Sequence, residues 1–342
     1  MEKLIVASMR KSAGKTSLIV GMAQNLDKKM AYLKPFGDRL IYEEKRLWDY
    51  DSSVIRDVFN IPEKPEEMSI GFDYSKLRYV YDEEKTKQKL DEFASGDKDI
   101  LFIETGRNLT YGSSVHLDPI SVAKYTGAKL VMVIKGNERA IDDLTFVNKY
   151  LNLKGINFGG IIINQVKDIE EFKVKQLGLI EQTGIDVLGV LPYKTELTHF
   201  SVNLIAKCLT SKVIAGEEGL NNEVEHIFIG AMGGHEAFRN PMFEKENRLI
   251  ITGGDRVDII LGSLNDYTSG IILTNNIVPP SNIISRADRY QIPLILVPSD
   301  TYKTANKVYS IEPLLSIGEK GKLFLLKDMV NNHLNLDKFL VF

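Results

Sequence analysis

The chain has 342 residues, a length that favours two domains, and its 44% hydrophobic and 26% charged residues exclude a disordered or fibrous protein. Lysine and arginine number 43 against 46 aspartates and glutamates, so the net charge is −3 and we expect no nucleic-acid partner. The single cysteine, Cys208, excludes an internal disulfide and a cysteine-based zinc site, and the apolar runs are too short to cross a membrane, so we expect a cytoplasmic protein without a membrane partner.

The first part of the chain alternates short apolar strands with amphipathic helices. Continuous runs of Ile, Val and Leu between helices are typical of parallel strands that are covered on both faces. We therefore predict an α/β fold with a doubly wound parallel sheet. The expected strands are 4–8, 31–34, 100–104, 129–134, 160–164 and 187–191. The expected helices are 16–26, 83–93, 119–125, 141–151, 170–182 and 202–209.

The alternation stops at a stretch rich in Gly, Asn and Glu over 215–225 and then restarts. Strands are expected at 227–230, 249–252, 270–273 and 293–297, and helices at 257–264, 283–290 and 302–310. This second part is long enough to form a small α/β domain of its own. We therefore predict one domain over 1–212 and a smaller one over 213–342.

The segment between the first expected strand and the first expected helix has the pattern of a phosphate loop. Lys15 would neutralise the β- and γ-phosphates of a nucleotide, and the Thr16 hydroxyl would bind Mg²⁺. Gly14 would let backbone amides at the helix N-terminus approach the phosphates. A chance Gly-Lys-Thr at a helix start is the alternative. The first glycine of the usual pattern is missing, and Ser8 is its nearest equivalent, at a spacing one residue longer. The cofactor-binding residues would be Ser12, Ala13, Gly14, Lys15, Thr16 and Ser17.

Three side chains further along the chain would complete this site. Lys34 ends the second expected strand, Asp51 starts a helix, and Glu104 ends a buried strand at the edge where open α/β sheets bind ligands. Mg²⁺ prefers hard oxygen ligands, so Thr16, Asp51 and Glu104 form a candidate metal set. Asp51 could instead be a helix N-cap. Glu104 could orient a metal ligand without binding the metal itself, or it could pair with Arg107.

Two further cations, Arg10 and Lys11, lie inside the loop. They could contact phosphate, an acidic co-substrate or a partner subunit across an interface. Alternatively, they could only raise the affinity for a polyphosphate through their charge. With Lys15 and Lys34 they are our candidate catalytic residues.

The strand–loop–helix at 4–26, Lys34-Pro35, Asp51 and Glu104 together resemble dethiobiotin synthetase, a phosphate-loop enzyme with the longer loop spacing. The resemblance continues through 131–135, 160–164 and 188–192. It implies a P-loop NTPase-type fold with ATP and Mg²⁺ as cofactors. It also implies that Asp51 and Glu104 bind the metal, that Lys34 lies near the substrate carbamate and phosphate, and that Asn164 contacts the adenine. Asn164 could instead be a turn residue after a strand.

The chain is more similar to the dethiobiotin-synthetase-like N-terminal half of long phosphate acetyltransferases and its stand-alone relatives, in which a DRTGG domain follows. The segments 249–261, 270–274 and 293–302 resemble that domain. At Gly253-Gly254-Asp255-Arg256 a glycine turn leads into a helix that Asp255 would cap, and its amides could meet an anion. The alternative is a tight turn with Arg256 in an ion pair. The chain ends at Phe342 without the acetyl-transferring domain, so the resemblance does not imply acetyltransferase activity.

Two functions remain open at this point. The first is an ATP-dependent synthetase or ligase that phosphorylates a carboxylate or carbamate and then closes or ligates it. The second is a nucleotide-dependent regulatory or sensing protein of acetyl and CoA metabolism, with slow ATPase activity or none. The family context favours the second, because Thr105-Gly106-Arg107-Asn108 replaces the glycine-rich loop of the synthetase. The partners this implies are a nucleotide, a small carboxylate or other metabolite, a metabolic enzyme and a second copy in a dimer.

Overall fold

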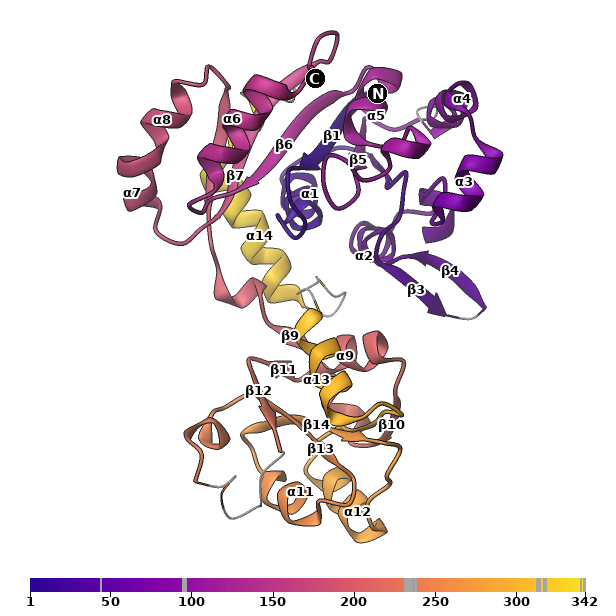
Figure 1. Ribbon diagram of the computed structural model, residues 1–342, viewed down its shortest axis with the longest axis vertical. Helices are drawn as coiled ribbons and strands as arrows, with labels where there is room; N and C mark the ends of the chain where they lie inside the picture. The colour runs from indigo at the N-terminus through magenta and orange to yellow at the C-terminus, as the bar shows by residue number, and fades with distance from the viewer. Residues whose placement is uncertain are drawn as a thin grey trace. The chain divides into compact units, whose positions relative to one another are not determined.

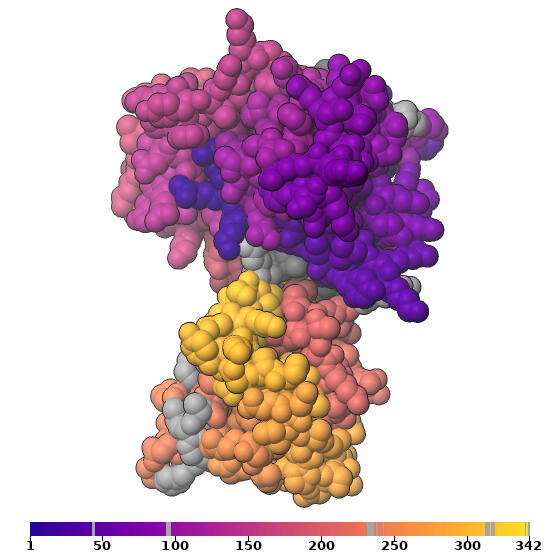
Figure 2. Space-filling view, turned by 45° about the vertical axis from the view of Figure 1, so that its right-hand side comes forward, coloured from indigo at the N-terminus to yellow at the C-terminus, as the bar shows by residue number. Residues whose placement is uncertain are grey.

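The computed structural model describes residues 1–43, 45–93, 97–230, 236, 239–311, 315, 319–338 and 340. Its contacts divide the chain into two compact units (Figure 1). Unit 1 is Met1–Lys194 with Glu319–Phe342, and unit 2 is Thr195–Gly318. In Figure 2 residues 1–194 run from indigo to pink, and unit 2 continues from pink to orange.

Unit 1 is built on a six-stranded sheet with the order β2-β5-β1-β6-β7-β8. All neighbouring strands in it are parallel, as predicted. The chain runs from β1 to β2 on one side of β1 and later crosses from β5 to β6 on its other side, so the strand order reverses at β1, and open α/β sheets bind ligands at the carboxyl end of such a switch point. The strands are β1 (Glu2–Ser8), β2 (Met30–Leu33), β5 (Ile100–Glu104), β6 (Lys129–Lys135), β7 (Phe158–Val166) and β8 (Val187–Pro192).

Helices connect the strands of unit 1, and their apolar sides pack on the sheet to form its main core. They are α1 (Lys15–Gln24), α2 (Tyr50–Phe59), α3 (Tyr74–Val80), α4 (Glu83–Phe93), α5 (Pro119–Thr126), α6 (Ala140–Tyr150), α7 (Ile169–Phe172) and α8 (Gly178–Glu181). A π-helical turn over Lys173–Leu177 joins α7 to α8, so the helix predicted at 170–182 is one interrupted segment. Short 3₁₀ helices cover Pro65–Met68, Ser113–Val115 and Leu336–Lys338. The hairpin of β3 (Leu40–Glu43) and β4 (Arg46–Asp49), together with α3, has no counterpart in the sequence prediction.

The units begin and end at other residues than the predicted ranges 1–212 and 213–342. Helix α14 (Lys320–His333) packs on α1 of unit 1 (Figure 1). Gly21 permits this close approach, because a Cβ there would lie 2.5 Å from Val330 Cγ2. Helix α9 (Val202–Leu209) belongs to unit 2, since Val202 and Ile205 are buried in its core.

Unit 2 has a five-stranded sheet with the order β10-β15-β14-β13-β12. Only the β10–β15 pair is antiparallel among the described pairs of this sheet. The strands are β10 (Lys212–Ala215), β12 (His226–Ile229), β13 (Arg248–Gly253), β14 (Thr268–Thr274) and β15 (Leu294–Leu296), with a separate pair of β9 (Phe200–Ser201) and β11 (Glu223–Val224). The other helices are α11 (Val257–Ser263), α12 (Ser281–Arg289) and α13 (Thr301–Ser310), with 3₁₀ turns at Thr195–Leu197, Glu217–Asn221 and Pro241–Glu244. The two sheets confirm the predicted fold class, a doubly wound α/β sheet followed by a smaller α/β unit.

Arg248 is a buried cation at the start of β13, with 1% of its surface exposed. Its guanidinium donates to the carbonyl of Phe243, to the carbonyl of Lys245 at 3.3 Å and to Asn265 Oδ1 at 3.0 Å. It also lies 4.4 Å from the centroid of the Phe243 ring. Burial lowers the pKa of Arg248, so these neutral partners offset only part of the cost of removing the charge from water.

We expect Arg248→Leu to lower the free energy of unfolding by about 2–4 kcal/mol, because it leaves buried carbonyl oxygens without a donor. Urea unfolding of the full chain, followed by circular dichroism, measures the change. The matched control is Arg286→Leu, since Arg286 is an exposed arginine that lies over the Tyr290 ring at 5.7 Å. An equal loss in the two variants would contradict a structural role for the buried guanidinium.

None of the helices in the described ranges is long and apolar enough to span a membrane. The longest of them, α14, covers 14 residues.

Candidate functional site

The loop between β1 and α1 has the backbone of an anion-binding turn. Ser12 and Gly14 both have positive φ, 56° and 87°. A Cβ at Gly14 would lie 2.4 Å from Asn164 Nδ2, so both the conformation and the packing favour glycine there. Gly14 is the N-cap of α1 and offers no side-chain hydrogen bond to the first turn. The amides at the N-terminus of α1 can therefore receive an anion.

Lys15 is buried at the start of α1. Its Nζ donates to Ser8 Oγ at 3.2 Å, and Ser8 Oγ donates to the carbonyl of Arg10 at 2.8 Å. Ser8, in place of the usual glycine, thus holds both the lysine and the loop. In the described part of the chain no carboxylate forms an ion pair with Lys15. Burial, together with the charge of Lys34, lowers the pKa of Lys15. A phosphate would supply the missing opposite charge.

Thr16 and Glu104 meet at the carboxyl end of β5. Thr16 Oγ1 donates to Glu104 Oε1 at 3.0 Å, and Tyr32 OH donates to Glu104 Oε2 at 2.9 Å. Burial, followed by the charge of Asp51, raises the pKa of Glu104 to about 7. The hydroxyl and the carboxylate are hard oxygen ligands placed side by side, and the raised pKa marks a buried carboxylate whose charge the nearby cations Lys34 and Lys15 compensate only in part. Thr16 and Glu104, two of the three residues predicted to hold a metal, therefore fit one.

Lys34 lies within a group of three aspartates. Its Nζ contacts Asp51 Oδ2, and it lies 2.5 Å from Asp38 Oδ1 and 3.2 Å from Asp49 Oδ1. Although its burial acts in the opposite direction, the charges of Asp49 and Asp51 raise the pKa of Lys34 well above its usual value. The charge of Lys34 is thus compensated within the protein.

Asp51 is a partner of two cations and does not cap α2. The cap is Asp49, whose carboxylate accepts from the amide of Asp51 at 2.9 Å. Asp51 accepts from Arg39 at 3.0 Å in addition to Lys34. Burial opposes ionisation, but the charges of Arg39 and Lys34 hold the pKa of Asp51 below its usual range. The negative charge of Asp51 also raises the pKa of Glu104, so these two predicted metal ligands influence each other electrostatically.

The structure gives Arg10 a partner outside the loop. Its guanidinium donates to both carboxylate oxygens of Asp143 in α6, at 2.7–3.1 Å. Lys11 lies in the exposed part of the loop. The sequence suggested Arg107 as a partner of Glu104, but Arg107 Nε instead lies 3.4 Å from Asp38 Oδ2. These contacts place Arg10 and Arg107 with carboxylates that the sequence analysis did not single out.

Two amide side chains at the end of β7 hold the loop. Asn164 Nδ2 donates to the carbonyl of Ala13 at 2.9 Å, and Gln165 Nε2 donates to the carbonyl of Ser12 at 3.0 Å. Asn164 Oδ1 accepts from the amide of Gln165. The position of Asn164 at a strand end beside the loop follows from the sequence, but its contact with the loop backbone and the role of Gln165 do not.

The glycine turn of unit 2 is tight. A Cβ at Gly254 would lie 1.7 Å from the carbonyl oxygen of Ile277, and Arg256 Nε lies 3.6 Å from Asp258 Oδ1. The prediction that Asp255 caps the following helix is wrong, because α11 begins after Arg256 without a side-chain cap. The turn matches the structural alternative, a close packing of backbone that requires glycine, with Arg256 in an ion pair.

Comparison with known proteins supports both resemblances. The chain matches a family model described as an AAA domain over residues 2–201 and one described as a DRTGG domain over residues 204–311. It is 24% identical to the phosphate acetyltransferase of Nitratidesulfovibrio vulgaris, over 91% of this chain and 48% of that protein. It is 31% identical to the phosphate acetyltransferase of Synechocystis sp., over 48% of this chain and 25% of that protein.

A third relative matches unit 1 in particular. The ATP-dependent dethiobiotin synthetase BioD of Methanocaldococcus jannaschii is 27% identical over 191 residues, which are 52% of this chain and 88% of that protein. By contrast, the chain spans at most about half the length of the two phosphate acetyltransferases. The predicted composition, a dethiobiotin-synthetase-like phosphate-loop domain followed by a DRTGG domain, is confirmed.

Proposed function

We propose, from the premise that the chain belongs to the AAA domain family, that unit 1 binds Mg-ATP and that the protein is a nucleotide-dependent regulatory or sensing protein. One observation carries the proposal. The buried ammonium of Lys15, without a carboxylate partner in the described residues, lies next to the paired oxygens of Thr16 and Glu104 at the N-terminus of α1. A nucleoside polyphosphate with a divalent cation supplies the charges that this arrangement lacks.

Different residues of unit 1 would bind the phosphates and the metal. The amides at 12–17 and Lys15 would bind the β- and γ-phosphates, and Thr16 and Glu104 would hold Mg²⁺. The negative charge of Asp51 would attract the same ion. When bound, Mg²⁺ would neutralise charge on the phosphate oxygens. Asn164 and Gln165 would keep the loop in its binding conformation through Ala13 and Ser12. Asn164 also remains the candidate contact for the adenine.

The surroundings of Lys34 favour sensing over synthesis. A synthetase of the dethiobiotin type would use this lysine for an anionic co-substrate, but Asp38, Asp49 and Asp51 already compensate its charge. Arg10 is likewise engaged with Asp143. The alignment over about half of the N. vulgaris phosphate acetyltransferase supports a link to acetyl metabolism. A metabolite, a metabolic enzyme and a second copy of the chain are the partners that this proposal implies.

We expect Lys15→Ala to weaken Mg-ATP binding roughly 100-fold, because it removes the cation that faces the phosphates. Titration of the full chain with a fluorescent ATP analogue in the presence of Mg²⁺ measures the affinity. Lys149→Ala, at an exposed lysine in the last turn of α6, is the matched control and should bind like the parent chain. Unchanged affinity in Lys15→Ala would refute the assignment of the phosphate loop.

Phosphate release separates the sensor from the synthetase. With Mg-ATP alone, the sensor should release phosphate slowly or not at all, and small carboxylates, carbamates and amines should not accelerate the release. Acceleration by any one of them would contradict the sensing function. It would favour an enzyme that phosphorylates that co-substrate.

A further inference from the structure

A second group of metal-ligating side chains lies in unit 2, outside the phosphate-loop site. Strands β9 and β11 pair antiparallel, with Ser201 opposite Glu223 and Phe200 opposite Val224. His199 immediately precedes β9 and Glu225 immediately follows β11, at the same end of this strand pair. Because side chains alternate along a strand, residues 223 and 225 point to the same face, where a cross-strand neighbour at 199 can reach both. The topology thus brings one imidazole and two carboxylates together.

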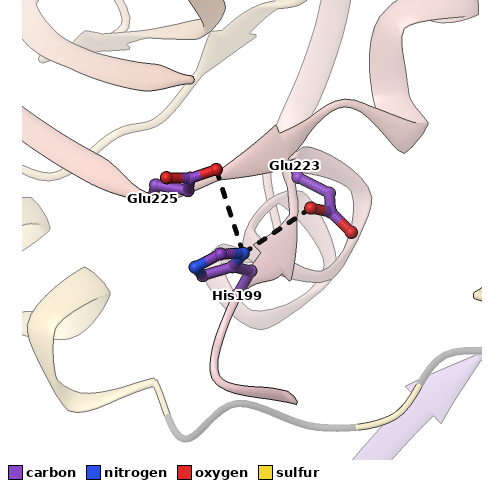
Figure 3. Close-up of side chains that lie close together, drawn as sticks. All are labelled: His199, Glu223 and Glu225. Carbon is purple, nitrogen blue, oxygen red and sulfur yellow. Dashed lines mark ion pairs between the residues drawn. The ribbon is translucent and has the colours of Figure 1, made fainter. Parts of the chain in front are cut away.

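The imidazole of His199 faces the carboxylates of both Glu223 and Glu225, and each of the two forms an ion pair with it (Figure 3). His199 Nδ1 lies 3.6 Å from Glu223 Oε2 and 3.9 Å from Glu225 Oε1. Each residue offers one ligand atom, and these atoms all lie within 4.8 Å of one another. The two distances from Nδ1 are longer than a hydrogen bond. They are close to the separation of about 3.4 Å between two ligands of a tetrahedral zinc ion with bonds of about 2.1 Å.

The position of Glu225 is fixed by a neighbour that is not itself a ligand. Asn247 Nδ2 donates to Glu225 Oε1 at 2.8 Å, and the carbonyl of Asn247 accepts from the amide of Glu225 at 2.9 Å. Such outer contacts orient a ligating carboxylate. The two carboxylates bring negative charge to the group, which a divalent cation would compensate.

We propose that His199, Glu223 and Glu225 bind a divalent transition-metal ion, with zinc as the best match. One imidazole nitrogen and two carboxylate oxygens form a donor set that suits zinc, and water would complete a tetrahedron. The side chains are 21–48% exposed, so an ion can reach them from solvent. Bound zinc would link the segment before β9 to β11 within unit 2, independently of the nucleotide site. Because the ion would bind only where the two strands are paired, it would stabilise that pairing.

The test is a zinc titration of the full, chelator-treated chain by calorimetry, in excess Mg²⁺ so that the oxygen ligands of unit 1 are occupied. We expect one zinc ion per chain and a roughly 100-fold loss of affinity in Glu223→Gln and in His199→Ala. The matched control is Glu217→Gln, since Glu217 is an exposed glutamate of unit 2 outside the group. This variant should bind zinc like the parent chain.

Hydrogen exchange gives an independent readout on the unaltered chain. Zinc should slow the exchange of amides at 199–201 and 223–225 and leave the amides at 12–17 unchanged. The proposal is overturned if Glu223→Gln and Glu217→Gln bind zinc equally well. It is also overturned if zinc does not bind saturably below millimolar concentration, or if protection appears only in the phosphate loop.

Discussion

Replacing Lys34 with methionine should lower the free energy of unfolding by about 3–5 kcal/mol, because it leaves buried carboxylates without their main counter-charge. Lys34 is 1% exposed, and its ammonium contacts Asp38, Asp49 and Asp51, all of them buried or nearly so. Methionine keeps much of the volume of the lysine stem, so the loss reports the charge more than the packing. Urea unfolding of the full chain at pH 7 measures it.

The pH dependence identifies the carboxylates as the cause. Lys34 and Arg39 hold the pKa of Asp51 below its usual range, so this carboxylate contributes stability above its unfolded pKa of about 3.9, and that stability is lost as pH falls through the folded pKa. Without Lys34 the buried carboxylates bind protons more readily, so the difference between Lys34→Met and the parent chain should shrink as pH falls from 7 and become smallest below about pH 4. Adding Asp38→Asn to Lys34→Met should recover part of the loss at pH 7, because one uncompensated charge is removed.

An exposed ion pair provides the control for Lys34. Lys85 Nζ lies 3.8 Å from Asp82 Oδ2, and both side chains are largely exposed. Lys85→Met should therefore change the free energy of unfolding by less than about 0.5 kcal/mol. If Lys34→Met were as stable as Lys85→Met, the three aspartates would not depend on Lys34.

The main sheet of unit 1 could be predicted because its strands are buried on both faces. Residues 4–7 of β1 are fully buried and form a continuous apolar run that is visible in the sequence. The β3–β4 hairpin lacks that signal, since Leu40, Tyr42 and Leu47 are substantially exposed. The placement of α14 on α1 could not be predicted, because it depends on packing between Gly21 and Val330, far apart in the chain.

For the candidate site, local pattern predicted which residues lie at the carboxyl edge of the sheet but not their partners. Thr16 follows from the loop motif and Glu104 from the end of a buried strand, and the two are hydrogen bonded. The engagement of Lys34 with three aspartates depends on the hairpin that the sequence pattern did not reveal, since β4 ends at Asp49. Asp143 was missed as well, because only tertiary packing brings α6 to Arg10.

Glu104→Gln should make the ligand-free chain more stable above pH 7. Burial and the charge of Asp51 raise the pKa of Glu104 to about 7, against about 4.3 in an unfolded chain. Between these values the folded state holds a proton that the unfolded state has lost, so the free energy of unfolding falls as pH rises through this window. Glutamine resembles the protonated acid and should remove this slope, with a gain of about 2–3 kcal/mol at pH 8. Urea unfolding at pH 5 and pH 8 measures it.

The same substitution should abolish stabilisation by Mg-ATP, because the neutral amide is a poor ligand for Mg²⁺ beside Thr16. In the parent chain, Mg-ATP should raise the melting temperature in proportion to its binding, whereas in Glu104→Gln the shift should be nearly lost. Glu171→Gln, at an exposed glutamate paired with Lys175, should behave like the parent chain in both measurements. A residue with only a structural role would lose stability when replaced. A Glu104→Gln chain that is more stable without ligand and is no longer stabilised by Mg-ATP would therefore assign Glu104 to the metal. A Glu104→Gln chain that is less stable than the parent at pH 8, or that Mg-ATP stabilises fully, would contradict that role.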